Sequence, residues 1–493
     1  MYRSLKIINI SLLSLTLSQC SVGPHFHSPS PPAINRYTES PTQETFKQGI
    51  GAQWWTVFQN ESLNNLIKQG LENSPTIEAA QAALKQARAN YAVKFGNALF
   101  PSVDLQVLGS REKDSSSIPG IPNPDPSLNP SSSPTTGSNI FNLLNLQFNL
   151  AYTLDFFGAN RRALEALCAQ VEYQAFQLEG TYLSLSTNIA QAAISSAGQS
   201  ALLEATTLLL QSQERLLEII KKQLALGAAT RLAVLTQETL VAQTRASLPA
   251  FELNLAQQRH ALYMLVGAFP ADNFLPHFKL ADISLPESLP LTLPSHLVRQ
   301  RPDIRAQEAL LHQASANIGV ATANLFPQIT LTGYYGWQSS ALNTLFTSPN
   351  QIGNITAQLL QPVFHGGALR AQRRAALTAY EQAHALYQQT VLQAFQNVAD
   401  VLTAIDQHRI SLAYQEAAEQ SAKKSLDLTE QQFTLGGASI INLLDAQQQY
   451  QTIVQNRLQA QIARLLDAVN LFQALGGGWL TLAQNVNHPG NKT

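Results

Sequence analysis

Residues 366–405 read GGALRAQRRAALTAYEQAHALYQQTVLQAFQNVADVLTAI, and this stretch decides the fold. No proline interrupts the chain between Pro362 and Pro489. Within the stretch, seam positions recur at alternating steps of three and four residues, at Leu377, Tyr380, His384, Tyr387, Val391, Phe395, Val398, Leu402 and Ile405. That spacing predicts a helix with one largely apolar face, the pattern by which helices pack side by side as coiled coils.

A second helix is expected to return beside the first. Gly436-Gly437 is the only helix-breaking pair before Gly476, and the seam resumes after it at Leu458, Ile462, Leu465, Val469 and Phe472. The sequence therefore predicts helices at about 368–435 and 438–475, joined by a glycine turn. At about 1.5 Å per residue the first arm would be roughly 100 Å long, more than an ordinary globular core contains.

The hairpin has an earlier copy. Segment 155–163 (DFFGANRRA) resembles segment 363–371 (VFHGGALRA), and the turn 226–229 (LGAA) resembles the turn 435–438 (LGGA). Taken at the shared glycines, the offsets are 366 − 158 = 208 and 436 − 227 = 209. An internal repeat of this size predicts a duplicated unit of short helix, β segment, long helix, turn and returning helix.

This duplication divides the chain into ordered parts. We predict a signal peptide (1–19), an N-terminal extended segment (20–61), a first repeat (62–267) with long helices at about 160–226 and 229–265, a linker (268–294), a second repeat (295–476) and a C-terminal tail (477–493).

Alternating apolar and polar residues predict four strands, at about 101–110, 141–156, 327–338 and 351–363. In the second, Leu146, Phe148 and Leu150 share one face, while Gln147 and Asn149 share the other. Alternation over roughly ten residues with aromatic residues near the ends is typical of a membrane β-barrel. Four strands cannot close such a barrel, but three chains would supply about twelve. The alternative is a soluble sheet, which would leave the signal peptide and the long arms unexplained.

The N-terminus indicates export. Arg3 and Lys6 precede an apolar run, Ile7–Leu17, which is too short to span a bilayer as a mature helix. Leu17-Ser18-Gln19-Cys20 resembles a bacterial lipoprotein processing site, which predicts acylation of Cys20, although a small residue is expected where Gln19 stands. The alternative is an ordinary signal peptide with an incidental cysteine.

Composition narrows the function classes. The formal net charge is −1 and only 13% of residues are charged, which does not suggest a nucleic-acid partner. The histidines lack metal-ligand spacing, and no catalytic constellation or cofactor motif is recognised. We expect His384 to be packed in its seam, Cys168 to be a small buried filler, and Trp54-Trp55 to be a structural anchor.

Four motifs together resemble the TolC-like outer-membrane efflux proteins, in particular their NodT/OprM-type lipoprotein branch. They are Cys20–Pro24 (CSVGP), Trp54–Phe58 (WWTVF), Arg301–Ala306 (RPDIRA) and Pro362–Gly367 (PVFHGG), in family order along the mature chain. The resemblance implies a mainly α-helical fold with a transmembrane β part. Duplicated strand hairpins and long helical hairpins would form a homotrimer, with a twelve-stranded outer-membrane barrel continuous with a periplasmic helical barrel.

The same resemblance implies an exit duct for small molecules, working with a periplasmic adaptor and an inner-membrane transporter of the RND type. It implies a protein anchored by lipid and spanning the outer membrane. Two alternatives are the outer-membrane channel of a type I protein secretion system and a non-channel periplasmic coiled-coil scaffold. An enzyme is a further class, for which no catalytic residues are found.

Two sites follow from the resemblance. Gly227, Gly436 and Gly437 would form the periplasmic tips that meet the adaptor, and glycine also suits a turn with left-handed dihedral angles. Asn442 and Asp445 match the position of the family's closing gate, and a trimer would place three Asp445 carboxylates around the axis. The alternative is an aspartate on a solvated helix surface.

The first hairpin lacks a matching charge. We expect its corresponding positions to be Leu232 and Ala233, neither of which carries a charge.

Overall fold

The structure is a computed structural model of the whole chain. It describes residues 21–34, 36–37, 53–113, 140–285 and 294–477. The predicted signal peptide, Cys20 itself and nearly all of the C-terminal tail lie outside the described residues.

The described elements occur in two matching series. The first contains α2 (Glu61–Asn73), α3 (Pro75–Leu99), β1 (Ser102–Lys113), β2 (Ile140–Leu154), α4 (Ala159–Ala225) and α5 (Arg231–Leu265). The second contains α6 (Pro294–Gln300), α7 (Pro302–Ala323), β3 (Gln328–Ser339), β4 (Gln351–Leu360), α8 (Ala368–Thr434) and α9 (Ile440–Ala474). Both outgoing arms have 67 residues and both returning arms have 35, so the duplication extends to element length.

Three element ends differ from the expected bounds for local reasons. The returning helices α5 and α9 begin two residues later than expected, because Thr230 and Ser439 act as N-caps with extended backbones. β4 ends at Leu360 rather than at about 363, and Pro362 has no N–H to donate to a further ladder. In contrast, α5 continues through Pro249.

The chain divides into two compact units, and each takes residues from both repeats. Unit 1 comprises residues 1–27, 87–170 and 311–382, and unit 2 comprises residues 28–86, 171–310 and 383–493. The compact units therefore do not coincide with the two sequence repeats.

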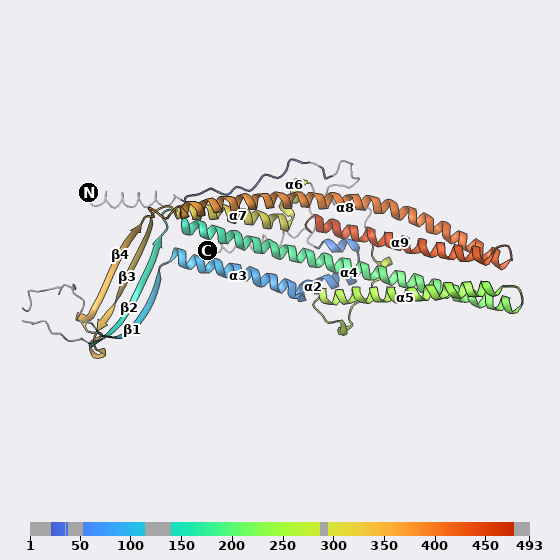
Figure 1. Cartoon of the computed structure of the whole chain (residues 1–493), viewed down its shortest axis with the longest axis horizontal. Helices are drawn as coiled ribbons and strands as arrows, with labels where there is room; N and C mark the ends of the chain where they lie inside the picture. Colours follow the sequence, from blue (N-terminus) through green and yellow to red (C-terminus); the bar gives the residue numbers. More distant parts are fainter. Residues whose placement is uncertain (1–20, 35, 38–52, 114–139, 286–293, 478–493) are drawn as a thin grey trace, which may run out of the picture. The chain divides into compact units, whose positions relative to one another are not determined.

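Unit 1 contains one antiparallel sheet in the order β1-β2-β3-β4 (Figure 1). The central β2–β3 pairing joins the two repeats. Register aligns apolar residues across the sheet, so that Leu105 faces Phe148 and Phe148 faces Tyr335. These three side chains are 58%, 46% and 54% exposed, so the apolar face is uncovered in the single chain.

The opposite face of the sheet carries amides. The Gln147 Nε2 donates to Gln106 Oε1 at 3.2 Å and to Asn149 Oδ1 at 2.8 Å, and Asn149 Nδ2 donates to Gln106 at 3.0 Å. The alternation predicted from the sequence thus separates an apolar face from a polar one.

The core of unit 2 includes the predicted tryptophan anchor. Trp54 and Trp55 are each 2% exposed, and Trp54 stacks on Phe472 of α9 with ring centroids 5.2 Å apart. The Trp54 indole N–H also donates to Ser186 Oγ of α4 at 3.3 Å. The pair is therefore structural, as expected.

The Arg301 motif also has a structural role in unit 2. The Arg301 guanidinium donates to the carbonyl of Ala474 at 2.8 Å and pairs with Asp303 at 2.6 Å. Ala474 is the last residue of α9, where carbonyl groups lack partners within the helix. Arg301 thus caps this helix end with a charge-assisted hydrogen bond.

The structure corrects the expectation that Cys168 is buried. It is exposed on α4 and not buried, whereas Ala166 and Ala169 on either side are 6% and 0% exposed. The helical period turns these two alanines inward and places Cys168 between them on the outer side. His384 is half-buried, in keeping with a packed seam position.

None of the helices in the described part of the chain is both long and apolar enough to cross a membrane.

Candidate functional site

The tip of the first hairpin is built around Gly227, whose φ is +78°. The Gly227 N–H donates to Leu224 O at 3.0 Å, and the Ala228 N–H donates to Gln223 O at 2.8 Å. These two bonds form a Schellman motif, in which a left-handed residue after the helix satisfies its last carbonyl groups.

The second tip repeats this chemistry. Gly436 has the same φ of +78°, its N–H donates to Phe433 O at 3.1 Å, and the Gly437 N–H donates to Gln432 O at 2.8 Å. The left-handed backbone angle that favours glycine therefore occurs at Gly227 and Gly436. Gly437 does not have a positive φ.

Both tips expose matched apolar side chains. Leu226 is 83% exposed and Leu435, 435 − 226 = 209 positions later, is 87% exposed. Leu232 and Ile441, also 209 positions apart, are 70% and 60% exposed. Large apolar side chains exposed at matched positions of both turns favour an interaction surface there.

The cap of α9 positions the predicted gate residues. The Asn442 N–H donates to Ser439 Oγ at 3.2 Å, and Asn442 and Asp445 are both exposed one turn apart. Asp445 lines a groove in unit 2 between α5 and α9, together with Leu232, Leu235, Thr236, Thr239, Leu240, Gln243, Ile441, Leu444 and Gln448. The structure thus brings Asp445 beside the first hairpin, whereas Asn442 does not line the groove.

The repeat partner of Asp445 needs a correction. The caps Thr230 and Ser439 are 439 − 230 = 209 positions apart, which pairs Asn442 with Ala233 and Asp445 with Thr236, so that Leu232 corresponds to neither gate residue. Thr236 is also uncharged, so the carboxylate belongs to the second hairpin alone.

An apolar core supports the tips. In the first hairpin it consists of Leu210, Leu217, Ile220, Ala233, Val234 and Val241. Phe433 and Ile440 of the second hairpin pack against this core. Apolar packing therefore holds the two tips of one chain together, whereas each turn joins only the two helices of its own hairpin.

A clamp in unit 1 fixes the chain just after Cys20. The Val22 N–H donates to Phe157 O at 3.1 Å, and the buried Arg162 donates to Val22 O at 3.3 Å and to Gly23 O at 3.4 Å. Gly158 has a φ of +82°, and a Cβ there would lie 2.6 Å from Ser21 Oγ. Ser21 therefore lies against the junction of β2 and α4, a contact that the sequence analysis did not predict.

The described residues contain no group of three or more His, Cys, Asp or Glu side chains placed to hold a metal ion. The features that can be functional are the tips, the groove at Asp445, the two-faced sheet and the clamp near Cys20.

Comparison with known proteins identifies the family. The profile of the family described as outer membrane efflux protein matches residues 66–268 and 293–477. The chain belongs to this family.

Similar proteins are found among efflux components. The pyoverdine export outer membrane protein OpmQ of Pseudomonas aeruginosa is 31% identical over 434 residues, covering 87% of each chain. The toluene efflux pump outer membrane protein TtgI of Pseudomonas putida is 31% identical over 484 residues, covering 96% of this chain and 98% of that protein.

Solved channels share the fold. The outer-membrane channel OprN has a TM-score of 0.85 at 25% identity, over 93% of this chain and 100% of that one. The open state of the Neisseria gonorrhoeae MtrE channel has a TM-score of 0.81 at 26% identity, over 93% and 99%. The predicted fold class and the predicted function, an outer-membrane exit duct of an efflux pump, are confirmed.

Proposed function

We propose that three copies of this chain assemble into one continuous duct, which releases small molecules as the exit of a tripartite pump. The observation that carries this proposal is a four-stranded sheet with an exposed apolar face and an amide-bearing face. Membrane barrels present their apolar face to lipid and their polar face to the lumen.

The strand count supports three copies. Within the described residues, β1 and β4 are the edge strands of the sheet, and each pairs on one side only. Unpaired strand edges are not tolerated in the hydrocarbon layer, so β1 of one copy must pair with β4 of the next. Three copies supply about twelve strands, within the range of known barrels. Native mass measurement in mild detergent should therefore give a threefold species, and a stable monomer would reject the assembly.

The tips support docking of a periplasmic adaptor. Their four exposed apolar side chains, Leu226, Leu232, Leu435 and Ile441, occur as matched pairs at the two turns. A transporter of the RND type in the inner membrane would complete the pump. The names of OpmQ and TtgI refer to small exported molecules, which favours efflux over protein secretion for this chain.

The clamp supports a lipid anchor on Cys20. Ser21 lies against Gly158 at the end of a strand that we place in the membrane, so an acyl chain on the preceding residue would start near the membrane surface. The anchor would thus be at the periplasmic side of the outer membrane.

Asp445 is proposed as the gate residue, with Asn442 beside it. In a trimer three Asp445 carboxylates would surround the axis and form a cation-attracting ring. The support is its exposure and its place in the groove near the tip.

The efflux function is tested in cells that express a partner pump but lack their own duct. The wild-type chain should lower accumulation of a fluorescent pump substrate to the level of the intact strain. Leu226→Asp combined with Leu435→Asp should raise accumulation towards that of the duct-free strain, because charge replaces both apolar tip contacts. Leu253→Asp is the matched control, since Leu253 is 58% exposed on α5 but is not part of the tip set. Full efflux by the double variant would reject the tips as the docking surface.

A further inference from the structure

The short helices α3 and α7 are equivalent elements of the two repeats. They begin at Pro75 and Pro302, which are 302 − 75 = 227 positions apart, and the same offset aligns residues 86–90 (QARAN) with residues 313–317 (QASAN). One face is buried in both helices, at Ile77 and Leu84 in α3 and at Ile304 and Leu311 in α7. The two helices can therefore be compared residue by residue.

A second face is covered in α7 but not in α3. In α7 it consists of four buried small residues, Ala306, Ala309, Ala316 and Gly319. This face lies on α4, because Ala306 and Ala309 form a core cluster with Phe176 and a Cβ at Gly319 would lie 2.7 Å from Arg162 Cγ. The four equivalents in α3 are also small, but all are exposed in the single chain: Ala79, Ala82, Ala89 and Ala92. The α3 face thus keeps the small side chains that let two helices approach closely.

The start of α8 is uncovered in a matching way. α4 and α8 have equal lengths and begin at Ala159 and Ala368, an offset of 368 − 159 = 209. Near the start of α4 the buried residues include Arg162, Ala166, Ala169, Phe176 and Glu179. Their equivalents on α8 are all exposed in the single chain: Ala371, Ala375, Thr378, Ala385 and Gln388. α8 therefore presents the face on which α4 carries α7.

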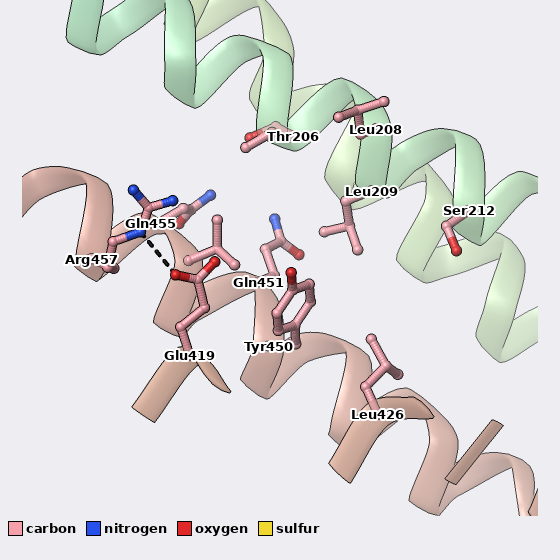
Figure 2. Close-up of a pocket in the computed structure, with 12 residues that line it drawn as sticks. Thr206, Leu208, Leu209, Ser212, Glu419, Leu426, Tyr450, Gln451, Gln455 and Arg457 are labelled. Atoms are coloured by element: carbon pink, nitrogen blue, oxygen red, sulfur yellow. Dashed lines mark hydrogen bonds and ion pairs between the residues drawn. The ribbon is translucent and has the colours of Figure 1, made fainter. Parts of the chain in front are cut away.

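This uncovered face does not extend along the whole of α8. Further along, Leu217 of α4 and its equivalent Leu426 of α8 are 9% and 8% exposed, so packing within the chain covers both. Figure 2 shows this region, where Leu426 and Tyr450 of α9 lie across a pocket from Leu209 of α4. The hairpins thus cover each other there, whereas the start of α8 is left exposed.

Strand pairing explains which helices meet within one chain. β2 leads into α4 and α7 leads into β3, and the pairing of β2 with β3 accompanies the packing of α7 on α4. β4 leads into α8 and α3 leads into β1, but β1 and β4 are the two edges of the described sheet. In the proposed trimer β4 of one copy pairs with β1 of the next, and α8 and α3 then belong to adjoining copies.

We propose that α3 of one copy packs on the start of α8 in the next copy, in the register in which α7 packs on α4 within a chain. This inference rests on the proposed trimer and adds to it the residues that meet. Ala92 lies against Ala371 of the adjoining copy, because these are the equivalents of Gly319 and Arg162.

The same register brings a polar pair together. Glu78 and Gln388 are the equivalents of Arg305 and Glu179, whose charges interact within the chain. The Gln388 amide donates a hydrogen bond to the Glu78 carboxylate of the adjoining copy, which is a charge-assisted bond. The polarity of this contact is therefore exchanged between the two helices and not lost.

A disulfide between copies tests the register. Since a Cβ at Gly319 would lie 2.7 Å from Arg162 Cγ, it would lie within about 4.2 Å of Arg162 Cβ, a separation that a disulfide can bridge. Ala92→Cys combined with Ala371→Cys, in a chain that also carries Cys168→Ser, should form covalent dimers and trimers in outer membranes after mild oxidation. Each single cysteine variant should stay monomeric on a denaturing gel.

Val93→Cys combined with Ala371→Cys is the matched control. Val93 is 62% exposed but lies one position beyond Ala92, so it is turned away from the shared face. This pair should give at least tenfold less cross-linked product. Equal cross-linking of the two pairs, or a bond that forms only within one chain, overturns the register.

Charge substitutions test the polar pair. Gln388→Glu places two carboxylates side by side and should lower the temperature at which the trimer dissociates on a gel. Adding Glu78→Arg recreates the charges of Arg305 and Glu179 and should restore the wild-type temperature. Gln389→Glu is the control, since Gln389 is an exposed neighbour outside the shared face and should dissociate like the wild type. Equal dissociation temperatures of Gln388→Glu with and without Glu78→Arg overturn the pairing with Glu78.

Native mass measurement of the same samples separates this inference from the assembly on which it rests. A threefold species without cross-linking between Ala92→Cys and Ala371→Cys overturns the register and leaves the trimer standing. A stable wild-type monomer overturns both.

Discussion

Glu179 shows how a single residue can control stability in this fold. It lies on α4 with 9% of its surface exposed, and burial raises the pKa of its carboxyl from 4.5 to about 7, against the opposing charge of Arg305. Arg305 is itself held by α7, with its guanidinium carbon 4.9 Å from the Phe176 ring centroid. The protonated carboxyl is therefore favoured by the folded state over much of the acidic range.

The first prediction follows from this shift. Since the folded pKa exceeds the unfolded one, the stability contributed by protonated Glu179 is complete below about pH 4.5 and is lost as the pH rises through about 7. Thermal unfolding between pH 5 and 8 should therefore show the wild type losing about 2 kcal/mol relative to Glu179→Gln, discounted for residual solvation. The exposed Glu172→Gln should keep the wild-type slope. Parallel curves for wild type and Glu179→Gln would contradict the shift.

The second prediction concerns acylation of Cys20. Its basis is the position of Ser21, which lies against Gly158 just after the end of β2. Labelled fatty acid should enter the wild type and not Cys20→Ser, while Cys168→Ser should label like the wild type. Because the sheet also spans the membrane in the proposed assembly, Cys20→Ser should still insert and keep part of the efflux activity. Equal labelling of all three proteins would reject the anchor.

Single-residue environments were the least predictable from sequence. The helical period locates a seam but not which neighbouring positions lie outside it, so Cys168 was wrongly expected to be buried. Glu179 was missed because its partner Arg305 lies 305 − 179 = 126 positions away. The clamp of Arg162 on Val22 and Gly23 likewise depends on a contact about 140 positions long, which no local pattern encodes.

Elements were predicted more closely, because their signals are periodic and local. The three-and-four spacing predicted the second helical hairpin and the internal repeat predicted the first, both with helix ends within about two residues of those observed. Period-two alternation predicted the two faces of β2 that the register shows. Thr230 and Ser439 directly precede α5 and α9, and a hydroxyl residue in this position is a signal of a helix start that the sequence itself carries. The amide network on the polar face depends on strand register, which the sequence leaves open.

The next prediction concerns the sheet and compares two adjacent residues of β1. Leu105 and Gln106 point to opposite faces of β1, and only the Leu105 face is apolar. In the proposed barrel Leu105→Arg would place a charge in lipid at a cost of about 2–4 kcal/mol near the membrane centre, whereas Gln106→Arg would face the lumen. The amount of heat-modifiable protein in the outer membrane should therefore fall for Leu105→Arg and change little for Gln106→Arg. Equal assembly of both variants would argue against a lipid-facing Leu105.

The assembly proposed for the whole molecule follows from the sheet, which is incomplete in a single chain. The sheet ends in two edge strands, and its apolar face is uncovered in the single chain. Strand arithmetic was therefore sufficient to propose a trimer from the sequence. The gate role proposed for Asp445 could not be inferred in the same way, because in the proposed trimer its neighbours across the axis would come from the other two copies.

The last prediction concerns the ring of Asp445 carboxylates proposed for the trimer. If three Asp445 side chains surround the axis, a divalent or trivalent cation should bind between them and block a single-channel current in planar bilayers. Asp445→Ala should weaken the block and increase passive entry of large antibiotics in cells. Asn442→Asp should strengthen the block, since it adds three charges one helical turn away. Asp400→Ala removes an exposed aspartate of α8 outside the groove and should leave the block as in the wild type. Unchanged conductance and unchanged block in Asp445→Ala would show that this carboxylate does not line the constriction, and that Asp445 is a solvated surface residue at the tip.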